Sequence, residues 1–115
     1  MQYRTLTGTG LTVSRISLGT MTFGAQVNEA DAIQIVNKAL DAGINFIDTA
    51  DIYTNGTAET ILGKALKDKR NGVVLASKVG NQVGPYRLKD TGLSRWHVIK
   101  GVEACLKRLD TDCLD

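Results

Sequence analysis

The sequence predicts an α/β fold of the (β/α)8 TIM-barrel type, of which the chain holds the first three to four βα units after an N-terminal β-hairpin. Strand-like and helix-like segments alternate along its 115 residues at roughly 30 residues per unit, and eight such units make a barrel of about 250 residues. The competing open, doubly wound sheet is disfavoured because the first strand lacks the Gly-x-Gly-x-x-Gly loop that such sheets use for phosphates. Residues 19–24 read Gly-Thr-Met-Thr-Phe-Gly instead. We therefore expect residues 1–115 to be one incomplete domain.

The first elements follow from turn, cap and stop signals. Residues 3–15 predict a hairpin, because two strand-like runs flank the Gly-Thr-Gly turn at 8–10. Residues 16–19 then predict a strand. Asn28 is a good N-cap for the first helix, whose apolar residues recur at helical spacing, and Gly43 ends that helix as a C′ glycine does.

The next two units repeat this order. Residues 45–48 predict a second strand, and a polar loop leads from it to a second helix over 58–67. Residues 73–79 are an apolar run, which predicts a third strand buried on both faces. After a long polar loop, of a kind that is often functional, Ser94 caps the third helix. Residues 111–115 predict the start of a fourth strand.

Composition and charge disfavour several classes of protein. The net charge is +2, from 14 basic and 12 acidic residues, which gives no footprint for nucleic acid or an anionic membrane. The basic cluster at residues 67–70 is interpreted as a helix C-terminal cap. No apolar run approaches the ~20 residues of a membrane helix, and the N-terminus shows no secretory signal. Cys105 and Cys113 lack metal-site or disulfide spacing, so we expect buried thiols, no metal and a cytoplasmic protein.

Two charged residues stand at the carboxyl ends of neighbouring predicted strands. Asp48 ends the second strand and Lys78 lies near the end of the third, each on a face that alternate residues share. In barrels this end carries the active site, so we expect a carboxylate and an ammonium to meet there. Tyr53 follows in the next loop, where a nearby ammonium would favour the phenolate and make the tyrosine a usable general acid. The alternative interpretations are a structural ion pair and a surface aromatic residue.

Several motifs, in the expected order, resemble the aldo-keto reductase family. Residues 45–53 (Asn-Phe-Ile-Asp-Thr-Ala-Asp-Ile-Tyr) resemble the signature in which the catalytic Asp and Tyr are five residues apart. Residues 24–26 and the Leu-Ser-Arg-x-His motif are most similar to the branch of bacterial general-stress reductases and the β subunits of voltage-gated potassium channels. The other matching segments are 18–24, 58–66, 76–80, 92–99 and 102–109.

The resemblance implies reduction of a small carbonyl substrate by hydride from NADP(H). In this family Tyr53 would give a proton to the carbonyl oxygen, Lys78 would promote that transfer, and Asp48 would hold Lys78. The residues implied around the nicotinamide end of the cofactor are Gly19, Thr20, Met21, Gln26 and Asp48.

The chain also departs from the family pattern. Asp110 and Cys113 stand where the family usually has Gly and Tyr, and Ala58 where it often has Ser. The family's fourth catalytic residue, usually His, and its phosphate-binding segments come after the last residue of this chain, and we expect His97 to be structural or capping. The second hypothesis is therefore a non-catalytic, self-associating half-barrel or a regulatory, cofactor-sensing subunit. We expect self-association or complementation by a C-terminal half.

Overall fold

Three parallel strands form the centre of the structure, a computed structural model that describes residues 1–115. In the sheet, Asp48 lies opposite Gly19 on one side and opposite Ala76 on the other. The sheet has the same order as the chain, and the parallel topology predicted from the sequence is confirmed. The strands are β3 (Leu18–Gly19), β4 (Phe46–Asp48) and β5 (Val74–Ala76).

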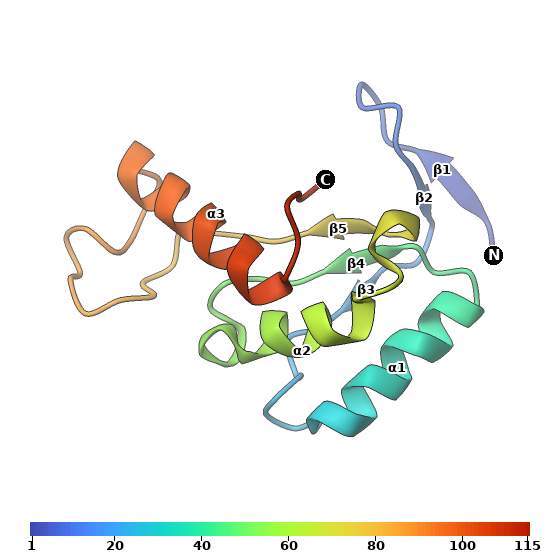
Figure 1. The fold of residues 1–115 in the computed structure, drawn as a ribbon. Coiled ribbons are helices and arrows are strands. Elements are labelled where there is room, and N and C mark those ends of the chain that lie inside the picture. The colour runs from blue at the N-terminus through green and yellow to red at the C-terminus, as the bar shows by residue number, and fades with distance from the viewer.

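A helix follows each parallel strand, as the alternating pattern predicted (Figure 1). α2 packs against both of the other helices and is therefore the middle helix of the layer. None of the three helices is both long and apolar enough to cross a bilayer. The helices are α1 (Glu29–Asp41), α2 (Thr57–Leu66) and α3 (Arg95–Leu109), with two short 3-10 segments, η1 (Tyr53–Gly56) before α2 and η2 (Arg70–Gly72) before β5.

One hydrophobic core joins the sheet to this helical layer. Ile47 of β4 and Leu75 of β5 are almost completely buried and belong to a single cluster with side chains from all three helices. Val36, Leu62 and Cys105 represent α1, α2 and α3 in that cluster. Each large apolar side chain buried in this way contributes about 1.5–3 kcal/mol. The sheet is therefore held firmly from one side.

The opposite face of the sheet is uncovered. Phe46 and Asp48 of β4 and Val74 and Ala76 of β5 point away from the helices and are only half-buried, because no element of the chain lies over them. The prediction that residues 73–79 are buried on both faces is therefore wrong. In a barrel this face would point inward.

The regular strand β5 is also shorter than predicted, because the ladder changes after Ala76. Thr49 N still donates to Ala76 O at 2.9 Å. The next bond of a regular parallel ladder would run from the backbone N–H of Lys78 to the Thr49 carbonyl. That carbonyl instead accepts a hydrogen bond from the Lys78 side chain at 2.8 Å.

The predicted hairpin is confirmed and lies at the amino end of the sheet (Figure 1). β1 (Tyr3–Thr5) pairs with β2 (Thr12–Ser14) in antiparallel register. Asn45, directly before β4, ties the hairpin to the sheet. Its side chain accepts from Ser14 N at 2.7 Å and donates to Thr12 O at 3.0 Å.

The predicted helix starts are confirmed by their caps. Asn28 Oδ1 accepts from the backbone N–H of Asp31 at 2.9 Å, and Ser94 Oγ accepts from that of His97 at 3.1 Å. A side-chain acceptor at the N-cap satisfies one of the four free N–H groups of a helix start. His97 lies in the first turn of α3, and its backbone N–H is the group that Ser94 caps.

Gly43 ends α1 in the predicted way. It has a φ of +85°, and its N–H donates to Leu40 O at 2.9 Å while Ile44 N donates to Ala39 O at 2.9 Å. This pair of bonds is the Schellman motif, which uses a left-handed residue at C′. Only glycine adopts that conformation without steric cost.

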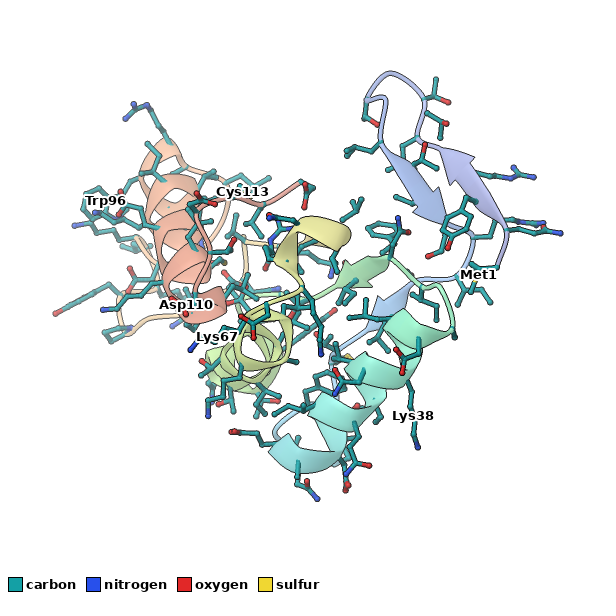
Figure 2. The ribbon with its side chains drawn as sticks, turned by 45° about the vertical axis from the view of Figure 1, so that its right-hand side comes forward. Met1, Lys38, Lys67, Trp96, Asp110 and Cys113 are labelled. Atoms are coloured by element: carbon teal, nitrogen blue, oxygen red, sulfur yellow. The ribbon has the colours of Figure 1, made fainter.

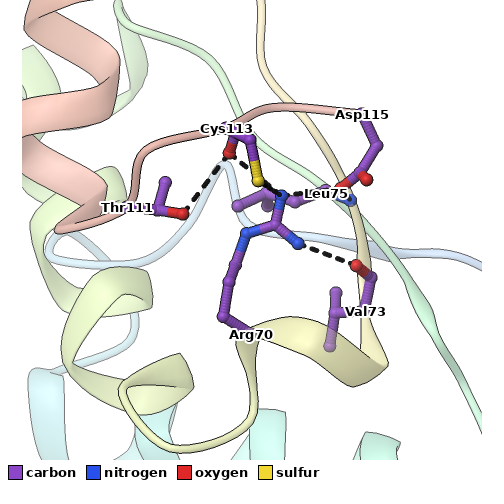
Figure 3. Close-up of polar contacts among 6 residues, drawn as sticks. All are labelled: Arg70, Val73, Leu75, Thr111, Cys113 and Asp115. Atoms are coloured by element: carbon purple, nitrogen blue, oxygen red, sulfur yellow. Dashed lines mark hydrogen bonds and ion pairs between the residues drawn. The ribbon is translucent and has the colours of Figure 1, made fainter.

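The C-terminal segment does not form the predicted fourth strand. Its single ladder-like contact is Asp115 N donating to Leu75 O at 3.0 Å, and the Leu75 N–H is taken by the Asp115 carboxylate at 2.9 Å (Figure 3). Arg70 holds the segment by donating to Cys113 O at 3.0 Å and pairing with Asp115 at 2.7 Å. The basic cluster at residues 67–70 lies at the C-terminus of α2, as predicted, with Lys67 as the C-cap residue, whereas Arg70 at its far end binds the C-terminal segment. Cys113 is exposed, which corrects the expectation of two buried thiols, and both cysteines are free.

Asp110 generates a first prediction about stability. It caps the C-terminus of α3 with a φ of +51°, a left-handed conformation, and follows the last helical turn (Figure 2). A side chain is strained there, and a negative charge opposes the helix dipole. We expect Asp110→Gly to raise the free energy of unfolding by about 1 kcal/mol in urea denaturation. Asp110→Ala removes the charge but not the strain, so an equal gain in both variants would contradict this account.

Asp115 generates a second prediction, about pH. Burial opposes its charge, but the hydrogen bond from Leu75 and then the contact with Arg70 outweigh that effect and lower the pKa of the carboxyl below its ordinary 3.8. A carboxyl with a lowered pKa stabilises the fold above its unfolded pKa, and the contribution is lost as pH falls through the folded value. We expect Asp115→Asn to cost about 1 kcal/mol at neutral pH, with the deficit closing below pH 3.8. A deficit that stays constant with pH in denaturation curves would refute the ion pair as its cause.

Candidate active site at the carboxyl end of the sheet

The structure brings together the three residues predicted to carry the chemistry. Lys78 Nζ lies 2.7 Å from Asp48 Oδ2, 2.8 Å from Thr49 O and 3.4 Å from Tyr53 Oη. The ammonium also lies over the Tyr53 ring, 5.1 Å from its centre. A carboxylate, an ammonium and a phenol therefore form one connected set at the carboxyl ends of β4 and β5.

The predicted meeting of Lys78 and Asp48 takes the form of a half-exposed ion pair. Exposed fractions are 50% for the Lys78 side chain and 34% for that of Asp48. The cause is the uncovered face of the sheet, toward which both side chains point. Exposed ion pairs contribute little to stability. A structural ion pair is therefore a weak explanation for this arrangement.

The pair nevertheless changes the acid–base behaviour of Lys78. Partial burial opposes the charge of the ammonium, but hydrogen bonds with Asp48 and then with Tyr53 outweigh it and raise the pKa of Lys78 above its ordinary 10.5. The group therefore keeps its positive charge across the neutral range. That charge lies beside the phenol oxygen, with Lys78 Nζ 3.4 Å from Tyr53 Oη.

Backbone bonds set the position of Tyr53 relative to Lys78. Asp51 N donates to Lys78 O at 3.1 Å, and Tyr53 N donates to Ala50 O at 3.2 Å. The segment that leaves β4 is therefore joined to the segment that carries Lys78 before it turns into η1. The half-buried Tyr53 ring also packs against the hydrophobic core.

The turn that carries Tyr53 is strained. Thr54 and Asn55 have φ values of +48° and +52°, and Gly56 follows with +86°. A left-handed β-branched residue is a genuine outlier, which costs on the order of 1–3 kcal/mol. Thr54 Oγ1 donates to Phe23 O at 2.9 Å and helps to hold this conformation. Such strain clusters at functional sites.

The residues predicted to contact a cofactor occupy different surroundings. Gly19 lies opposite Asp48 in the sheet, and Met21, two residues further along the chain, is 65% exposed. Thr20 is completely buried, and its hydroxyl donates to Asp48 O at 3.1 Å, so it supports the Asp48 backbone. Gln26 is exposed and forms no hydrogen bond with the other predicted site residues.

Sequence reasoning missed a buried polar network behind the site. Glu59 of α2 is completely buried and accepts from Ser77 Oγ at 2.6 Å and from Arg108 Nε at 2.7 Å. The sequence contains a signal for this network, because Glu59 lies among the apolar residues of its helix. A carboxylate buried at such a position needs a hydrogen-bond or charged partner.

Asp51 and His97 belong to the same buried region. Both are 3% exposed, and neither the Asp51 carboxylate nor His97 Nε2 has a hydrogen-bond partner. Burial, and then the charge of Glu59, raise the pKa of the Asp51 carboxyl, while Arg108 and His97 act in the opposite direction. This region lies on the helical side of the sheet, away from the exposed Lys78 ammonium.

A family model and several known proteins are similar to this chain in sequence. The model of the aldo/keto reductase family matches residues 15–115. A probable voltage-gated potassium channel subunit beta of Oryza sativa subsp. japonica is 44% identical over 121 residues, covering 100% of this chain and 36% of the relative. The uncharacterized oxidoreductase YrpG of Bacillus subtilis (strain 168) is 42% identical over 127 residues, covering 100% of this chain and 38% of the relative.

A solved aldo-keto reductase structure is also similar to this chain in fold. The holo form of aldo-keto reductase AKR11C1 from Bacillus halodurans superposes with a TM-score of 0.86 at 37% identity, covering 100% of this chain and 38% of that one. The structural neighbours are (β/α)8 barrels, so the predicted fold class is confirmed. The chain spans little more than a third of the length of the curated relatives it matches. It belongs to the aldo/keto reductase family.

Proposed function

We propose that this chain carries the proton-donating part of an NADPH-dependent oxidoreductase that reduces aldehydes or ketones. The observation that supports this most directly is the contact series from Asp48 through Lys78 to Tyr53, at 2.7 Å and 3.4 Å. Exposure of the series on the open face of the sheet leaves it accessible to a small carbonyl substrate. We place the protein in the cytoplasm, with which its two free cysteines agree.

Each member of the series has one role in the proposal. Tyr53 Oη donates its proton to the carbonyl oxygen while that oxygen gains negative charge. The Lys78 ammonium stabilises the phenolate left behind, because it lies beside Oη. Asp48 accepts a hydrogen bond from Lys78 and keeps the ammonium in place and charged.

The cofactor proposed is NADP(H), which supplies the hydride when bound. The residues at the end of β3 fit its nicotinamide ring, because nothing lies within 4 Å of the position that a Cβ on Gly19 would take. Met21 offers an exposed apolar side chain next to that open surface. Asp48 lies opposite Gly19, so a ring placed there would lie near the residue that holds Lys78. We propose that Thr20 contributes to this cofactor site by holding the Asp48 backbone, and that the exposed Gln26 contacts the cofactor directly.

A second candidate function is a non-catalytic half-barrel that associates with itself, or a regulatory, cofactor-sensing subunit. The uncovered sheet face with half-buried Phe46, Val74 and Ala76 favours association, since unpaired strand edges and apolar surface promote it. The relative named as a potassium channel β subunit favours the regulatory form. The partner of such a face would be a second copy or the C-terminal half of a barrel.

The two candidates are separated by solution mass and cofactor binding. We would measure the mass by light scattering, titrate NADPH by its fluorescence, and assay a generic aldehyde. Saturable NADPH binding with aldehyde turnover supports the reductase. A stable dimer that binds no NADPH and turns over no aldehyde supports self-association and contradicts the reductase proposal. NADPH binding without turnover favours the regulatory subunit.

Tyr53→Phe tests the proton donor. The variant removes only Oη, whose contact with Lys78 is long at 3.4 Å, so we expect the fold to be unaffected. With the chain in the context of a complete barrel that reduces aldehydes, we expect kcat to fall by about 10²–10⁴-fold, the usual contribution of general acid catalysis. Tyr3→Phe is the matched control, because Tyr3 lies in the hairpin and donates to Gly43 O. Equal activity of Tyr53→Phe and the parent chain would exclude Tyr53 as the donor.

Lys78→Met tests the ammonium. The methionine keeps most of the side-chain length but loses the charge beside Oη, so we expect kcat to fall by at least about 10-fold with little change in the circular dichroism spectrum. Lys64→Met is the control, because Lys64 forms an ion pair of similar length with Glu29 on the helical side. A comparable loss of kcat in both variants would mean that removing any lysine charge lowers kcat, and would contradict a specific role of Lys78.

A further inference from the structure

The ion pair between the buried Glu59 and the partly exposed Arg108 has no role in the proposed reaction. Glu59 has no exposed surface, and its two carboxylate oxygens are used by different partners, Ser77 Oγ at 2.6 Å and Arg108 Nε at 2.7 Å. Taking a carboxylate out of water is costly, and buried ion pairs are often no more stabilising than apolar residues of similar volume. The arrangement therefore calls for an explanation beyond stability.

One end of this network reaches the residue next to Lys78. Ser77 follows the last regular residue of β5, in the region where the Lys78 side chain has replaced a backbone ladder bond. Successive residues of an extended segment point to opposite faces, so Ser77 faces the helices when Lys78 faces the open side. The bond from Ser77 to Glu59 thus restrains the backbone from which Lys78 projects.

The other end reaches the turn that carries Tyr53. A Cβ on Gly56, the last residue of that strained turn, would lie 2.7 Å from Arg108 Cδ and 2.8 Å from Arg108 Nε. The Arg108 side chain therefore packs directly against the turn. Glu59 itself lies in the first turn of α2, which continues from Gly56. The network touches both backbone segments that determine the separation of Lys78 and Tyr53.

We propose that Glu59 is a positioning residue: held by Arg108, its carboxylate restrains Ser77 and the start of α2 and thereby keeps the Lys78 ammonium in contact with Tyr53. The catalytic meaning of this contact rests on the proposed reductase function. The contact itself is a property of the chain and is measurable without cofactor or substrate.

The groups around the Glu59 carboxylate hold it in one position. Cys105 Sγ lies 3.7 Å from both Ser77 Oγ and Arg108 Nη2. Burial, and then Glu59, raise the pKa of the Cys105 thiol to about 11, so it stays neutral beside the carboxylate. The Arg108 guanidinium supplies the compensating charge.

The test compares variants that break different links. Ser77→Ala removes the link to the Lys78 segment and leaves the Glu59–Arg108 pair intact, so a purely structural pair between α2 and α3 would not respond. Ser77→Thr restores the hydroxyl. Glu59→Gln removes the charge from the centre of the network. Glu29→Gln is the control, because it breaks an ion pair of α2 with α1 on the other side of that helix.

Two readouts are taken on the full chain by NMR: the cross-relaxation between the Lys78 side chain and the Tyr53 ring, and the pH titration of the Lys78 ammonium. We expect Ser77→Ala and Glu59→Gln to weaken the cross-relaxation several-fold and to move the titration midpoint down toward the ordinary lysine value. We expect Ser77→Thr and Glu29→Gln to behave like the parent chain.

An unchanged Lys78–Tyr53 contact in a folded Ser77→Ala variant would overturn the proposal. Thermal unfolding is recorded for each variant, and Ser77→Ala keeps the test decisive if Glu59→Gln does not fold. Failure of the chain to reduce aldehydes would count against the proposed function alone, because neither readout depends on turnover.

Discussion

The parallel register between β4 and β5 is the constraint on which the site depends. Pairing of Asp48 with Ala76 continues past the regular strands as Thr49 N to Ala76 O and Asp51 N to Lys78 O. These bonds place the carboxylate, the ammonium and the segment leading to Tyr53 at one end of the sheet. A slip of one residue would send Asp48 or Lys78 to the helical side, because neighbouring side chains alternate between faces. The hydrophobic residues Ile47 and Leu75 oppose that slip, since it would expose them.

Much of the fold was predictable because the responsible signals are local. Asn28, Ser94 and Gly43 have defined capping roles, and the alternation of strands with helices gave the parallel topology. The meeting of Asp48 and Lys78 was predictable from strand alternation together with their positions at the carboxyl ends of neighbouring strands. The left-handed backbone of Thr54 and Asn55 was not predictable, since neither residue type signals it strongly and a hydrogen bond to distant Phe23 supports it.

The remaining differences arise from contacts distant in the sequence. Residues 111–115 have strand-like character, yet Arg70 and the side chain of Asp115 take the positions that ladder bonds would use. Glu59, Ser77 and Arg108 come from three separate elements, so no local pattern links them. The half-exposed ion pair depends on what covers the open face of the sheet, which a periodic pattern does not report. Sequence periodicity thus predicts elements and their facing residues, whereas partners of buried charges require the assembled structure.

The hairpin has a practical consequence for labelling the protein. Its tip contains Gly8 and Gly10, where a Cβ added to either residue would meet no other atom within 4 Å, and Asn45 anchors its base at the amino end of the sheet. The candidate site with Asp48, Lys78 and Tyr53 lies at the opposite end of the sheet. Exposed loop tips tolerate insertions because no buried backbone bond is lost there. This tip is therefore a suitable place to insert an affinity tag or a fluorophore-binding sequence without disturbing the candidate site at the far end.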